Sequence, residues 1–251
     1  MQLLTAGIVL LALAATVPGL AADAADYRAV LADIDRMSSF TDSDYSCLLT
    51  VVSEKPGEQP NIQQAQMFRR DGDQKAVILI LKPAVQKGQG YLQVGESLWF
   101  YDPESRKFAH TALKENFQDT DAKHSDFRPP ALERDYRVAA AAEGELGRFR
   151  VYVLDLEAAN EEVSYARLRL WVRQDNHLLL KAENYGLSGR LLRTSYYPSY
   201  LQLGDKFVAA KMLFVDELRP GEKTQITLAN ASLAPIPDTV FTKAYLERVN
   251  R

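Results

Sequence analysis

The sequence predicts a mainly β protein: one large curved antiparallel sheet, or half-open β-barrel, of about 11–12 strands with helices covering its concave face. Short segments rich in Val, Leu, Tyr, Phe and Trp recur between turn signals from residue 45 onward. Helical periodicity is confined to the region before these segments, to one insertion and to the C-terminal end. No linker or internal repeat divides the strand region, and a single sheet of this length curls.

Composition excludes several functional classes. The chain has 251 residues, is 47% hydrophobic and 25% charged, and carries a formal net charge of −3. This balance is ordinary for a globular protein and gives no net basic field for nucleic acid. Cys47 is the single cysteine, so no intrachain disulfide and no cysteine-based zinc site can form. Its apolar neighbours predict a buried small hydrophobic residue. The three histidines His110, His124 and His177 leave little for a metal cluster, so we expect no metal.

Residues 1–24 predict a signal peptide, which leaves residues 25–251 as a single domain. The run from Leu3 to Ala22 is almost wholly apolar, and small residues suit cleavage after about Ala21 or Ala24. No Lys or Arg precedes the run, and its length would also serve as an uncleaved membrane anchor, so both alternatives stay open. No cysteine stands at the cleavage region, so the chain is not itself a lipoprotein. We expect an exported, periplasmic monomer.

Each element has its own signal. Residues 27–37 have one apolar stripe at helical spacing. The turn signals Asp71-Gly72 and Asp175-Asn176 predict tight hairpins. Alternation over 165–173 places Leu168, Leu170 and Val172 on one face and arginines on the other. The predicted strands are 45–53, 62–70, 74–82, 90–94, 97–102, 107–112, 148–156, 164–173, 178–186, 190–197, 207–216 and 223–232.

Two regions depart from the strand pattern. Residues 113–147 are polar, contain Pro129-Pro130 and include a short helix at 131–136. The C-terminal segment predicts a helix capped by Thr242, with Phe241 and Leu246 as a hydrophobic staple. Asp238 is an alternative cap one turn earlier.

Searches for chemistry favour ordinary structural roles. The elbow G-x-S-x-G is absent, and Gly186-Leu187-Ser188-Gly189 indicates a hairpin turn. His124-Ser125-Asp126 holds the three triad residue types, but contiguous residues cannot converge on one proton path. Four other groups have a plausible site role, but an ordinary structural role is more common for each. Solvated acids account for Asp119, Asp121 and Asp126, and surface charge accounts for Glu161-Glu162. Packing accounts for the aromatic groups Trp99-Phe100-Tyr101 and Tyr196-Tyr197 with Tyr200, and an exposed strand face accounts for Arg167, Arg169 and Arg173.

A series of short motifs, in order along residues 45–250, resembles the outer-membrane lipoprotein-sorting family, the broad LolA-like group of periplasmic carriers, and within it the longer, uncharacterised members. The motifs are Lys82-Pro83, Gly88, Gly90-Tyr91-Leu92, Leu98-Trp99-Phe100-Tyr101-Asp102-Pro103, Arg106-Lys107, Ser125-Asp126-Phe127, Leu170-Trp171-Val172, the turn from Tyr185 to Gly189, Arg193-Thr194, Thr224, and Phe241-Thr242 with Leu246. The resemblance implies a half-open barrel with an apolar cavity for acyl chains, without catalytic residues or cofactor.

The predicted function is therefore a carrier that moves acyl chains of lipoproteins or phospholipids towards the outer membrane. An inner-membrane transporter and an outer-membrane acceptor are possible partners. Two alternatives stay open: a lipid-acting hydrolase that pairs a serine with His110, His124 or His177, and a scaffold with a filled core that binds a membrane transporter. Strand alternation and the first helix predict the residues that line the cavity. They are Leu31, Ile34, Leu48, Val77, Leu79, Leu168, Leu170, Val172, Phe214, Ile226 and Leu228.

Overall fold

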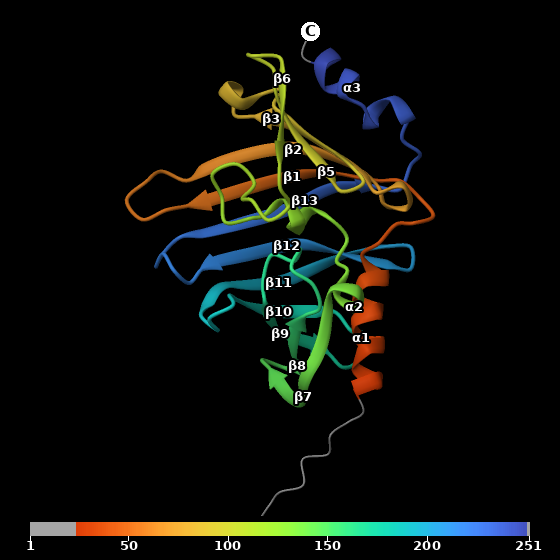
Figure 1. The fold of residues 1–251 in the computed structure, drawn as a ribbon, viewed down its shortest axis with the longest axis vertical. Coiled ribbons are helices and arrows are strands. Elements are labelled where there is room, and N and C mark those ends of the chain that lie inside the picture. The colour runs from red at the N-terminus through yellow and green to blue at the C-terminus, as the bar shows by residue number, and fades with distance from the viewer. Residues whose placement is uncertain (1–23, 250–251) are drawn as a thin grey trace, which may run out of the picture.

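Thirteen antiparallel strands form one continuous open sheet in the computed structural model, which describes residues 24–249 (Figure 1). The sheet confirms the predicted fold class and has one strand more than expected. The first six strands are β1 Tyr45–Glu54, β2 Asn61–Arg70, β3 Lys75–Lys82, β4 Gly90–Val94, β5 Ser97–Asp102 and β6 Lys107–Thr111. The other seven are β7 Tyr136–Leu146, β8 Phe149–Ala158, β9 Arg167–Arg173, β10 Leu179–Tyr185, β11 Leu191–Leu203, β12 Lys206–Asp216 and β13 Lys223–Ser232. The helices are α1 Ala24–Met37, α2 Leu132–Asp135 and α3 Lys243–Arg248.

The sheet consists of two meanders joined at its centre. Strands β1–β6 follow one another outward to one edge, and β13–β7 follow one another outward to the other. The joint is the pairing of β1 with β13, in which Val51 lies opposite Ile226. The edges β6 and β7 do not pair with each other, so the barrel is half open. The predicted signal peptide, apart from Ala24, lies outside the described residues. Within residues 24–249 no helix has both the length and the apolar character needed to cross a bilayer.

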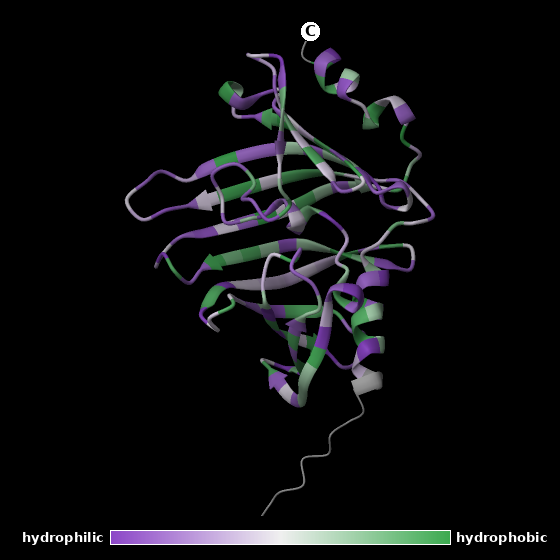
Figure 2. Ribbon diagram, in the orientation of Figure 1, coloured by the Kyte–Doolittle hydropathy of each residue, from purple (hydrophilic) through white to green (hydrophobic). Residues whose placement is uncertain are grey.

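Alternating side chains give the sheet two different faces. Along β1 every second residue from Tyr45 to Val51 is buried, and Cys47 is buried with a free thiol, as predicted. Strand β9 alternates in the same way, which confirms the predicted faces (Figure 2). The two predicted hairpins are also present, since β2 pairs with β3 and β9 with β10.

One face of the sheet is covered by two elements from different parts of the chain. The apolar stripe of α1 packs over the β8–β10 region, where Leu31 and Leu154 are buried in one cluster. The segment 112–131, here called the cover segment, crosses the middle of the sheet (Figure 1). Its residues Phe117, Ala122 and Phe127 are buried in a second cluster with residues of β1, β12 and β13.

The C-terminal helix α3 covers the opposite face. Leu246 is fully buried in a cluster with Val77 and Leu92, whereas Ile78 and Ile80, which alternate with Val77 on β3, belong to the cluster beneath the cover segment. The predicted cap is confirmed, because the Thr242 hydroxyl accepts a hydrogen bond from the Tyr245 amide at 3.2 Å. Asp238 instead forms an ion pair with Arg70.

The expectation that residues 113–147 contain only loop and a short helix is wrong in its second half. Strand β7 occupies 136–146 and pairs with β8 from Tyr136 opposite Ala158 to Leu146 opposite Phe149. Most of its side chains are exposed, because β7 is an edge strand with one neighbour. Its alanines, glutamates and glycine have low β propensity, so only the register with β8 establishes it as a strand.

Candidate ligand-binding cavity

A cavity of about 480 Å³ lies between the sheet and the two elements that cover it. Residues from both halves of the sheet line it, from Ala76 on β3 to Tyr136 on β7, so the sheet curls around this space. Four residues in its lining, Gln74, Glu96, Arg134 and Glu162, are exposed and form what is here called the polar rim. The deeper lining is mainly apolar and aromatic: Leu49, Met67, Leu168, Leu170, Tyr200, Val208, Met212 and Phe214.

A buried ion pair joins the cover segment to the sheet at this cavity. Both terminal nitrogens of Arg193 on β11 donate to the Asp126 carboxylate, at 2.6 and 2.8 Å. The Arg193 guanidinium also lies 4.2 Å from the centre of the Phe214 ring, and 5.1 Å from that of Tyr165. The pair is 7% and 14% exposed, so removing either partner would leave a buried charge without compensation.

Two further ion pairs hold other parts of the cover segment. Lys55, beyond the end of β1, pairs with Asp119 at 2.7 Å, on a carboxylate that is 81% exposed. Arg219, in the β12–β13 turn, pairs with Asp121 at 2.9 Å. The Thr224 hydroxyl in addition accepts a hydrogen bond from the Asp121 amide at 2.9 Å. The interpretation of all three acids as solvated loop residues is therefore wrong for Asp121 and Asp126.

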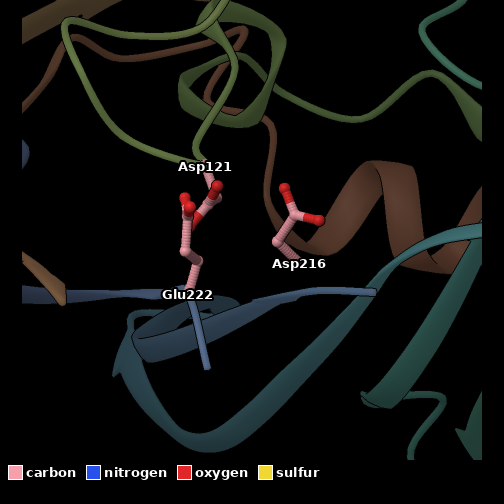
Figure 3. A group of neighbouring side chains, drawn as sticks. All are labelled: Asp121, Asp216 and Glu222. Carbon is pink, nitrogen blue, oxygen red and sulfur yellow. The ribbon is translucent and has the colours of Figure 1, made fainter. Parts of the chain in front are cut away.

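Asp121, Asp216 and Glu222 point toward one another in a group of three carboxylates (Figure 3). Arg219 supplies one positive charge among them, and its terminal nitrogens lie 2.9, 2.7 and 2.9 Å from the three carboxylates. Burial raises the pKa of the Asp121 carboxyl, and the Arg219 charge opposes that effect. The group is thus an arginine-centred clamp between the cover segment and the β12–β13 hairpin.

The helix pair α1–α2 is fastened by Asp35. Its carboxylate oxygens accept hydrogen bonds from the backbone amides of Leu132 and Glu133, both at 2.9 Å. This arrangement satisfies two amides at the start of α2, which otherwise lack partners within a short helix. Burial raises the pKa of Asp35 from 3.8 to about 6, despite these two bonds.

The residues predicted to line the cavity fall into three groups, and their role in binding stays a prediction. Leu31, Val172 and Ile226 are packed in the core clusters of the covered face without lining the cavity. Leu48, Val77 and Leu79 point away from it, because their neighbours Leu49, Ile78 and Ile80 occupy the covered face. Five residues line the cavity: Ile34, Leu168, Leu170, Phe214 and Leu228.

Other candidates from the sequence are distributed between the faces. Tyr197 and Tyr200 line the cavity, whereas Tyr196 is exposed on the other side of β11. Trp99 and Tyr101 pack beneath α3. The arginine face of β9 forms local ion pairs, with Arg169 bound to Asp155 and Arg173 to Asp175. Apart from Glu162, the residues of the polar rim and Arg193 were not predicted as site residues, because contacts this distant in sequence leave no local pattern.

The geometry required by the hydrolase alternative is not present in residues 24–249. The His177 ring bonds to the Asp33 carboxylate at 2.7 Å, and the rings of His110 and His124 pack against aromatic side chains. Throughout that range no hydrogen bond links a serine hydroxyl to a histidine ring. Ser125, of the string His124-Ser125-Asp126, instead lies 3.1 Å from the Ser164 hydroxyl.

Comparison with solved structures finds this architecture in bacterial proteins, three of which are described here. A LolA superfamily protein from Nitrosomonas europaea is 25% identical, with a TM-score of 0.75 over 87% of this chain and 98% of the other. A family model described as "Uncharacterized protein" matches residues 72–248. The chain belongs to the family that this model describes, and it is similar to the LolA superfamily protein over 87% of its length. No curated protein matches its sequence.

The other two structures extend the likeness in fold. A putative outer membrane lipoprotein-sorting protein domain from Vibrio parahaemolyticus has a TM-score of 0.79 at 17% identity, over 90% of this chain and all of that domain. A DUF1329 family protein from Desulfovibrio piger has the same TM-score at 18% identity, over 89% and 98% of the two chains. The chain therefore shares its overall fold with these two proteins over about nine-tenths of its length.

Proposed function

We propose that this LolA-like protein is a non-catalytic periplasmic carrier that binds acyl chains of lipoproteins or lipids and moves them towards the outer membrane. The observation that carries the proposal is a largely apolar cavity under a cover segment that is held to the sheet by side-chain contacts rather than by strand pairing. The scaffold alternative requires a filled core beneath the cover segment, whereas a cavity lies there.

The physical need for such a carrier follows from the hydrophobic effect. Burying an acyl chain is worth about 0.8 kcal/mol per methylene, so a chain of about 15 methylenes resists transfer into water by about 12 kcal/mol. A cavity lined by Leu170, Met212 and Phe214 can replace the bilayer around such a chain. Release then requires the cover to move, and the contacts of Asp126 and Asp121 are the ones that a partner must weaken.

The test starts from residues 25–251 purified from a membrane-containing host. Native mass spectrometry with organic extraction should detect bound lipid or acylated protein, and a fluorescent fatty acid should bind to protein freed of it. Ala209 lines the cavity and Ala210, its neighbour on β12, does not. Ala209→Trp should therefore weaken binding at least tenfold, while the control Ala210→Trp should bind as the wild type does.

Two results would contradict the proposal. One is a wild-type protein that carries no lipid and takes up no fatty acid. The other is equal loss of binding in Ala209→Trp and Ala210→Trp, which would place the ligand outside the cavity. Thermal unfolding of both variants checks that either tryptophan is accommodated.

A further inference from the structure

The cavity of about 480 Å³ is not fully enclosed and reaches the surface at the exposed polar rim. An acyl chain bound in its apolar interior would therefore leave the polar end of the ligand at this rim.

The charged residues in the lining show where the polar end of such a ligand would lie. Three arginines of the lining have a carboxylate partner: Arg69 with Asp71 at 2.6 Å, Arg134 with Asp135 at 2.8 Å, and Arg193 with Asp126 at 2.6 Å. Arg128 also lines the cavity, but no carboxylate among residues 24–249 lies within ion-pair distance of its guanidinium.

The surroundings of Arg128 make this lack of a partner costly. It follows the buried Phe127 and precedes Pro129, and it is half-buried next to the polar rim. Burial lowers the pKa of its guanidinium, Glu96 and Asp135 oppose that effect, and the positive charges of Arg134 and Arg69 add to it. Glu96 is exposed, so water screens its charge. A ligand anion beside Arg128 would supply the missing partner.

We infer that the cavity takes the acyl chain of an anionic amphiphile, whose carboxylate or phosphate is bound by Arg128 at the polar rim. The chain of the ligand lies against Leu170, Met212 and Phe214. A planar guanidinium can donate two parallel hydrogen bonds to either kind of anion, so both headgroups share this chemistry. The inference rests on the proposed carrier function and specifies its ligand class: a free fatty acid or a phospholipid.

The test compares three ligands with the same chain and different headgroups: dodecanoate, dodecyl phosphate and neutral dodecan-1-ol. Each displaces the neutral fluorescent probe N-phenyl-1-naphthylamine from delipidated protein at pH 7.5. We expect at least one anionic ligand to bind the wild type about tenfold more tightly than the alcohol, since hydrogen bonds to charged groups are strong. Which anion gains more distinguishes a fatty-acid source from a phospholipid source.

Substitution of the arginine separates headgroup binding from chain binding. Arg128→Met should abolish the preference for anions and leave the affinity for dodecan-1-ol within twofold of wild type. Arg128→Lys should retain part of the preference, because the charge remains. Arg137→Met is the control, since Arg137 on β7 is exposed and lies outside the cavity lining. It should keep the full preference.

Each outcome has a distinct meaning. If the wild type binds dodecan-1-ol and the anions equally, or if Arg128→Met keeps the preference, the inference is overturned while the carrier function stands. If none of the three ligands displaces the probe, the inference and the carrier function fall together. The melting temperature of ligand-free Arg128→Met should equal or exceed that of the wild type, because the substitution removes a half-buried charge that has no partner.

Discussion

The ion pair between Asp126 and Arg193 should be the strongest single contact that holds the cover segment on the sheet. Replacing Asp126 with asparagine keeps the shape of the side chain but leaves the Arg193 guanidinium, 7% exposed, without its counter-charge. Breaking a buried pair in this way costs about 3–5 kcal/mol. Since the asparagine oxygen still accepts one hydrogen bond, we expect a loss of about 3 kcal/mol in the free energy of unfolding.

The double variant Asp126→Leu/Arg193→Met completes the experiment. Both charges are then absent, and apolar replacement of a buried pair is often neutral or stabilising. We therefore expect the double variant to lie within about 1 kcal/mol of wild type, well above either single variant. The matched control is Asp119→Asn, whose pair with Lys55 has an 81% exposed carboxylate and should contribute about 0–1 kcal/mol.

Urea unfolding followed by circular dichroism gives the free energies, and limited proteolysis within residues 112–131 reports whether the cover segment opens before the sheet unfolds. The reasoning would be refuted if Asp126→Asn lost less than about 1 kcal/mol and its cover segment were cleaved no faster than that of Asp119→Asn. If Asp126→Asn unfolded in urea as the wild type does but its cover segment were cleaved faster, the pair would stabilise the closed cover and not the sheet.

Three other predictions concern single contacts. Because burial raises the pKa of Asp35 to about 6, ionisation of its carboxyl destabilises the folded state. The free energy of unfolding, measured relative to Asp35→Asn in the same buffers, should therefore be highest below about pH 4 and fall as the pH rises to 6. The fall should be at most about 3 kcal/mol. Thr242→Ala should cost about 1 kcal/mol by urea unfolding, since it removes the cap of α3, and Thr242→Ser should restore most of it. Leu170→Asp should abolish retention of a fluorescent fatty acid, whereas Leu187→Asp, at a residue that is 95% exposed, should not; normal retention by a folded Leu170→Asp variant would remove Leu170 from the proposed lining.

The elements that the sequence predicted well are those with a local signal. Strand β9 alternates Leu and Arg, and the start of α3 is specified by the Thr242 hydroxyl within one turn. Strand β7 has no such signal, because an edge strand rich in alanine obtains its structure from β8 alone. Its position became clear only from the pairing register.

The choice of face for apolar strands was the harder problem. On β3 both alternating sets are apolar, because the cover segment lies over Ile78 and Ile80 while α3 lies over Val77 and Leu79. A strand covered on both sides does not reveal from its own residues which set faces the cavity.

The motif residues Asp126, Arg193 and Thr224 all take part in the contacts of the cover segment, Asp126 with Arg193 and Thr224 with Asp121. The sequence contains each of them without showing that they meet.

The order of strands in the sheet also has a consequence for how the chain folds. Each meander contains contacts between neighbours in sequence and can assemble early. The central pairing joins β1 to β13, which are separated by most of the chain, and closing that long loop must precede any gain from the joint. Folding is therefore completed only after β13 has emerged. Until then the interior edge of β1 is open to other strands, so a chain that still lacks β13 is the form that most needs protection from aggregation.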